Sequence, residues 1–163
     1  MKCLSLLSLG VICVISSFAQ SNKEDVDLIQ AIYGKEKKEI VASFIMPPDD
    51  AKKSAFWSLY DAYEAQRKAL GKQRIALLEN YVNSYGQTND AATDGLMQQT
   101  MTLQRSLDSL IAANYDKIKK EVGVTQASQF YQIESYLLSA TRLYILDNIP
   151  FINELEKLPK PKK

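Results

Sequence analysis

Few residues of this 163-residue chain have side chains that could carry out catalysis or hold a metal ion. Histidine is absent, and the two cysteines, Cys3 and Cys13, both lie near the start of the chain. Sites for zinc, copper and nickel depend on imidazole or thiolate ligands, and Ser-His or Cys-His nucleophiles need the same groups. Carboxylates remain as possible acids, bases or ligands of calcium and magnesium.

Adjacent carboxylates occur at Glu24-Asp25 and at Asp49-Asp50. Paired carboxylates can act as general acid and base. Acidic residues are also favoured in the first turn of a helix, because they complement its dipole, and we interpret both pairs in this way. No carboxylate loop of the calcium-binding type and no glycine-rich phosphate loop is visible. We therefore expect a protein that is not an enzyme and has neither cofactor nor metal.

Residues 1–19, MKCLSLLSLGVICVISSFA, have the pattern of an export signal. Lys2 supplies a positive start, the following run is apolar, and Ser17 and Ala19 place small side chains where signal peptidase reads them. The apolar run is shorter than the roughly 20 residues that span a bilayer. We predict cleavage before Gln20, a periplasmic location and no integral membrane segment in the mature chain.

The mature chain of 144 residues is long enough for one domain with its own core. It would contain no cysteine, so no disulfide could support it, and its 19 basic residues would balance 19 acidic ones. Nucleic acid is not an expected partner, since phosphate binding needs a net basic face. A lipoprotein modified at Cys13 is the alternative, but Ile12 is large where a small residue is expected.

The periodicity of the apolar residues predicts an all-α domain over residues 20–150, a four-helix elongated hairpin bundle. The expected helices are 25–45, with a weak point at Gly34 that could divide it in two, and then 49–85, 91–122 and 125–149. Pro47-Pro48, Gly86 and Gly123 separate them. Residues 151–163 end in KLPKPKK and are predicted to be a disordered basic tail.

The second expected helix carries a stripe with alternating spacings of four and three, which directs one face toward a partner helix. Its members are Phe56, Tyr60, Tyr63, Arg67, Leu70, Arg74, Leu77 and Tyr81. Two interpretations stay open. The stripe is either core, with the arginine stems covering apolar surface, or a basic, partly apolar groove that binds a client protein. The candidate contact residues are Phe56, Trp57, Tyr60, Tyr63, Arg67 and Arg74; Trp57 lies beside the stripe and is the strongest interface candidate.

The fourth expected helix contains only three charged residues, Glu134, Arg142 and Asp147. So little charge indicates contact on several sides. The helix is expected to be central in the bundle or to form a dimer interface.

The starts of the second and fourth helices resemble each other, with Ser54-Ala55-Phe56-Trp57-Ser58-Leu59 matching Ser128-Gln129-Phe130-Tyr131-Gln132-Ile133 in residue type. In this the chain resembles the Spy/CpxP type of periplasmic helical protein, in which Leu-Thr-x-x-Gln segments open two helices. Residues 46–50 and 124–128 occupy the equivalent positions, although only Thr125 agrees outright. The resemblance covers about residues 23–149, and similar segments occur in uncharacterised exported bacterial proteins.

The resemblance implies a homodimer that binds unfolded proteins without ATP, as a periplasmic chaperone, or that modulates an envelope-stress sensor. The metal-sensing members of the wider group use histidines that this chain lacks. The alternative is an adaptor whose fourth helix docks one dedicated envelope signalling protein.

Overall fold

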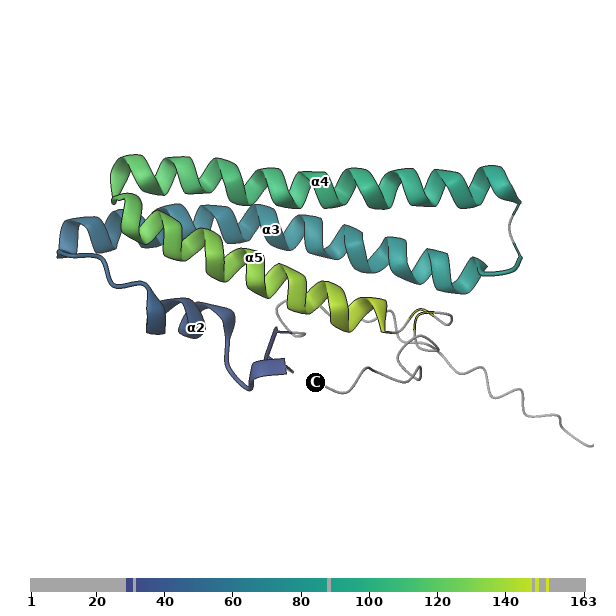
Figure 1. Cartoon of the computed structure of the whole chain (residues 1–163), viewed down its shortest axis with the longest axis horizontal. Coiled ribbons are helices and arrows are strands. Elements are labelled where there is room, and N and C mark those ends of the chain that lie inside the picture. The colour runs from purple at the N-terminus through teal and green to yellow at the C-terminus, as the bar shows by residue number, and fades with distance from the viewer. Residues whose placement is uncertain (1–28, 31, 88, 148, 150–151, 153–163) are drawn as a thin grey trace, which may run out of the picture.

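Figure 1 shows a computed structural model of the chain, which describes residues 29–30, 32–87, 89–147, 149 and 152. Within these residues it contains the helices α2 (Lys37–Phe44), α3 (Asp50–Ser84), α4 (Asp90–Glu121) and α5 (Val124–Leu146), and no strand. The predicted all-α class is confirmed. The predicted signal peptide, the Glu24-Asp25 pair and all of the predicted tail except Ile152 lie outside the described residues.

The two long helices begin at side chains that cap them. The Asp49 carboxylate accepts a hydrogen bond from the backbone N–H of Lys52 at 2.8 Å, and the Asn89 side chain accepts one from Ala92 at 3.0 Å. Each satisfies a backbone donor that has no partner within its helix. Asp49-Asp50 is therefore a helix start, with Asp50 in the first turn of α3.

The first expected helix is interrupted in its described part. Gly34 has a φ of +67°, a left-handed conformation that glycine adopts without steric penalty. Residues 32–33 are helical, and the chain returns to helix only at Lys37. The segment thus has the two-piece form that the weak point at Gly34 allowed.

α3 and α4 form a long antiparallel hairpin, and the shorter α5 runs beside both of them (Figure 1). α5 starts next to the end of α4 and stops well before the turn that joins α3 to α4. α2 lies against the same end of the bundle. We call the part of the hairpin that α5 and α2 cover the proximal half, and the part near the α3–α4 turn the distal half.

The core occupies the proximal half. Phe56, Tyr60 and Tyr63 of α3 pack with Phe130 of α5, and rings meet edge to face at centroid distances of 5.0 Å for Tyr63–Phe130 and 6.4 Å for Tyr60–Phe130. The other buried members come from α2, α4, α5 and the adjoining turns: Val41, Ile45, Ile111, Ile118, Val122 and Ala127. Burial of these apolar side chains is the main force that holds the four helices together.

Candidate functional site

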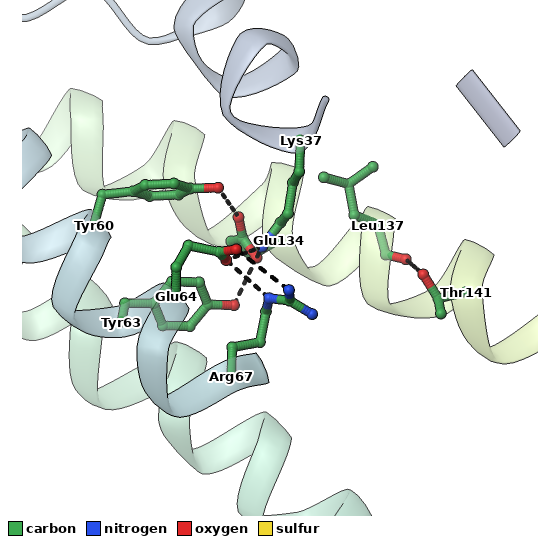
Figure 2. Close-up of polar contacts among 8 residues, drawn as sticks. All are labelled: Lys37, Tyr60, Tyr63, Glu64, Arg67, Glu134, Leu137 and Thr141. Atoms are coloured by element: carbon green, nitrogen blue, oxygen red, sulfur yellow. Dashed lines mark hydrogen bonds and ion pairs between the residues drawn. The ribbon is translucent and has the colours of Figure 1, made fainter. Parts of the chain in front are cut away.

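A buried polar cluster joins three helices beside the aromatic core (Figure 2). Lys37 of α2 donates hydrogen bonds through its Nζ to Glu64 Oε1 of α3 and Glu134 Oε2 of α5, both at 2.5 Å. The Tyr63 hydroxyl donates to Glu134 Oε2 at 2.6 Å, and Tyr60 donates to Oε1 at 3.4 Å. The Glu134 side chain is 2% exposed, so its carboxylate depends on these partners in place of water.

A second cation completes the charge balance of this polar cluster. Arg67 donates two hydrogen bonds to Glu64, from Nε to Oε1 at 2.8 Å and from Nη2 to Oε2 at 3.3 Å. Two cations therefore face two carboxylates in the interior. Burial acts to raise the pKa of Glu64, but the charges of Lys37 and Arg67 and their hydrogen bonds outweigh it and lower that pKa.

The tyrosines of the cluster are held in their protonated form. Burial first, and then the charge of Glu134, raises the pKa of Tyr60 and of Tyr63 above the usual value of 10. The void beside the cluster measures about 10 Å³, which is near the lower limit for a single water molecule. A substrate has no access here, so the arrangement supports a structural role: it fastens α2 to α3 and α5.

Sequence reasoning did not identify this cluster. A signal was present, because Glu134 continues the spacing of four and three that runs through Ala127, Phe130, Leu137 and Thr141, all of which are buried. A lone carboxylate on the apolar stripe of a helix requires a buried partner. Lys37 could not have been chosen as that partner from the sequence, since 97 residues separate it from Glu134.

The six predicted contact residues divide into three groups. Phe56, Tyr60 and Tyr63 are at most 1% exposed, so the structure places them in the core and not on a groove that a client could reach. Arg67 is also buried, in its ion pair with Glu64. For these four residues the core interpretation of the stripe describes the observed packing.

Trp57 and Arg74 lie elsewhere. The Trp57 ring is half-buried against Phe56 and Tyr60, at centroid distances of 5.0 and 5.5 Å, and the Lys38 ammonium lies 5.2 Å from its centroid. It therefore has more intramolecular packing than the sequence indicated. Arg74 lies at the border between the two halves of the hairpin and lines a cleft on the distal side.

This distal cleft has a volume of about 410 Å³. Most of its lining is apolar and comes from α3, α4 and the end of α5, including Leu77, Leu78, Tyr81, Met97, Met101, Leu107, Ile145 and Leu146. Arg74 and Arg142 also line it. The predicted stripe thus continues into this cleft through Arg74, Leu77 and Tyr81.

A second apolar surface lies on the outside of α5. Tyr136, Leu143 and Tyr144 are 64%, 61% and 45% exposed. At 3.6 residues per turn, Tyr136 and Leu143 lie about two turns apart on one side of the helix, and Tyr144 lies about 100° around the helix from Leu143. We call these three residues the α5 outer face. Within α5 only Glu134 and Arg142 are charged, and Glu134 points into the polar cluster. One side of α5 is therefore exposed. Its low content of charged residues does not mean that other helices surround it.

At its border the α5 outer face meets the segment before α2. The rings of Tyr33 and Tyr136 lie 6.5 Å apart. Burial, and then the hydrogen bond with Tyr136, raises the pKa of Tyr33 to about 12.

Comparison of the chain with family models, curated proteins and solved structures gave no match. The likeness to Spy/CpxP proteins therefore rests on the sequence features described above. Among the described residues no group of three or more cysteines and carboxylates is arranged to hold a metal ion. No helix in that part of the chain has the length and apolar character needed to cross a membrane.

Proposed function

We propose that this chain is an exported, non-enzymatic protein that binds other polypeptides without ATP, as a periplasmic chaperone or envelope-stress modulator. The observation that carries the proposal is the α5 outer face. Large apolar and aromatic side chains gathered on a charge-poor surface are typical of interaction sites.

The side chains of this face suit a protein partner. Tyrosine is enriched at protein interfaces because it brings a large, stiff apolar ring together with a hydroxyl that can hydrogen-bond at the rim. Tyr136 lies about two turns before Leu143 on this face, and Tyr144 directly follows it. Apolar contact of this kind is reversible and needs no energy source.

The second candidate is an adaptor that docks one dedicated envelope signalling protein. It is favoured by the burial of Phe56, Tyr60 and Tyr63, which removes them from any extended client-binding groove. What remains is a small patch on one rigid helix, and such a patch suits a single partner helix. The same patch would serve the predicted homodimer if the partner were a second copy of the chain.

The two candidates are separated by an aggregation assay on the protein that begins at Gln20. Two unrelated unfolding proteins are heated with it at equimolar ratio, without nucleotide. A chaperone suppresses light scattering from both, and the double variant Tyr136→Ser, Leu143→Ser loses at least half of that suppression. The matched control is Phe44→Ser, which removes an apolar side chain of similar exposure, 62%, from α2.

Failure to suppress aggregation of either protein would refute the chaperone proposal. The adaptor proposal is tested separately with a photo-crosslinking residue at position 143. A single dominant crosslinked envelope protein supports the adaptor, and a probe at position 44 is the control. Equal crosslinking from both positions would contradict a specific docking face.

A further inference from the structure

We propose that the distal cleft binds the C-terminal segment of the same chain, residues 150–158, as a short amphipathic helix. The inference concerns a different surface from the α5 outer face and goes beyond the proposed function. It restricts the disordered tail that the sequence predicts to the basic end, residues 159–163. It rests on where the described chain ends, on the sequence that follows, and on the lining of the cleft.

The described part of the chain ends within the lining of the cleft. Beyond α5, Ile149 and Ile152 both line it, together with Tyr81 of α3 and Met97 of α4. Ile152 is helical, and its backbone N–H donates a hydrogen bond to the carbonyl of Ile149 at 3.0 Å. A new helical turn therefore starts at the cleft, and residues 153–163 continue the chain from this point.

The sequence around and after this turn has the pattern of a two-turn amphipathic helix. Pro150 suits the first turn of a helix, and Pro159 cannot continue one. Between them Ile152, Leu155 and Leu158 recur at a spacing of three, which places them within about 120° of one another around a helix. The other residues from 153 to 157 are Asn, Glu, Glu and Lys. Such a helix has one apolar face to bury and one polar face for water.

The cleft matches this apolar face in length and character. Along α3 its lining runs from Arg74 to Tyr81, which is about 10 Å, and a helix from Ile152 to Leu158 covers about 9 Å. Most of the lining is apolar. Met97 and Met101 are exposed members of it, and their flexible side chains adapt to the shape of a packed neighbour.

The connection through Ile152 favours this segment over a second copy of the chain. Leu155 is only three residues beyond a residue that already lines the cleft. Binding is therefore intramolecular, and a short connection gives an effective concentration in the millimolar range. A second copy would have to reach a comparable concentration to displace the segment.

The test is paramagnetic relaxation enhancement in NMR spectra of the protein from Gln20 onward. This protein contains no cysteine, so Thr100→Cys carries a single nitroxide on an exposed residue of the cleft lining. The amide signals of residues 153–158 should lose at least half of their intensity relative to the reduced label. The control is a nitroxide at Thr125→Cys, an exposed residue about 30 Å along α5 from its end, which should leave those signals unchanged.

Two matched double variants, each with the nitroxide at position 100, test which face of the segment is bound. Leu155→Ser, Leu158→Ser removes two apolar side chains and should reduce the broadening of these signals at least twofold. Glu154→Ser, Lys157→Ser has the same spacing of three, leaves the net charge unchanged and should retain the broadening. Circular dichroism checks that each variant is folded.

Three results would overturn the proposal. The first is the absence of broadening, and the second is equal broadening in both double variants, which would mean that the segment is near the cleft without binding through its apolar face. The third comes from a mixture of isotope-labelled protein without nitroxide and nitroxide-labelled protein without isotope, in which equal broadening would identify a second copy as the occupant. Tyr136→Ser, Leu143→Ser should keep the broadening, so failure of this proposal and failure of the proposed function are distinguishable.

Discussion

The proximal and distal halves of the α3–α4 hairpin have the same kind of sequence but different surroundings. Both halves of α3 carry large side chains at spacings of four and three. In the proximal half these residues are fully buried under α5 and α2, as Phe56, Tyr60 and Tyr63 show. In the distal half Leu77 and Tyr81 line an open cleft. The comparison teaches that periodicity indicates which face of a helix is apolar, but not whether another element covers it.

The arginines on the stripe of α3 also differ in their surroundings. Arg67 is buried and has Glu64 as an ion-pair partner on the same helix. Arg74, seven residues later on the same stripe, lines both the distal cleft and the small void beside Glu134. Arg67 therefore belongs to a buried ion pair, whereas Arg74 lies where the packed core gives way to the cleft.

The largest loss of stability is expected when the polar cluster of the proximal half is broken. Lys37→Met keeps most of the apolar stem but leaves Glu134 and Glu64 without their shared ammonium partner. Loss of one partner of a buried ion pair costs about 3 to 5 kcal/mol. Urea unfolding at pH 7 measures this loss of unfolding free energy. The control is Lys35→Met, at an exposed position. A loss below about 1 kcal/mol would show that the cluster does not hold α2 in place.

Equal truncations in the two halves should have unequal effects. Phe130→Ala removes a fully buried ring and should lower the free energy of unfolding by about 3 to 5 kcal/mol. Met101→Ala, in the distal cleft at 42% exposure, should change it by no more than about 0.5 kcal/mol. Chemical denaturation of both variants gives the comparison. Losses of similar size would mean that the distal half is as well packed as the proximal half.

The response of stability to acid should come from the proximal half. The pKa of Glu64 is lowered in the folded protein, so folding favours its ionised form. Its contribution is complete above the usual value of 4.5 and is lost as the pH falls through the lower folded value. Glu64→Gln should therefore flatten the decline of stability below about pH 4.5, as measured by urea midpoints at several pH values.

The distal Glu79→Gln is the matched control for that experiment, since Glu79 is an exposed residue of the same helix. It should leave the acid dependence unchanged. A decline that is equally steep in Glu64→Gln and in the unaltered protein would contradict the assignment to Glu64.

A smaller effect than those of Lys37→Met and Phe130→Ala is expected at the two helix caps. Asp49→Ala and Asn89→Ala each remove one capping hydrogen bond, a change that costs about 1 kcal/mol. Asp49 begins α3 beside the core, so its loss should appear in global unfolding. Asn89 begins α4 at the distal turn, where local opening is easier, so Asn89→Ala should chiefly accelerate amide exchange near residues 90–96. Equal effects of both variants on global stability would remove the distinction between the halves.

Much of the fold could be predicted because its determinants are local. Pro47-Pro48, Gly86 and Gly123 separate the helices, and the observed α3, α4 and α5 begin within one residue of their expected starts. The candidate site could be predicted less well, because the stripe did not distinguish core from contact surface. Trp57 was expected to be the best interface residue, yet it packs against Phe56 and Tyr60.

The sequence by itself determined the helices, their order and the apolar face of each, because capping, turn residues and periodicity act over a few neighbouring positions. Only the tertiary structure decided which of those faces are covered. It brought Lys37 to Glu134 across 97 positions, and it placed α5 and α2 against the proximal half of the hairpin. Contacts between distant segments depend on the relative placement of whole helices, and no local pattern encodes that placement.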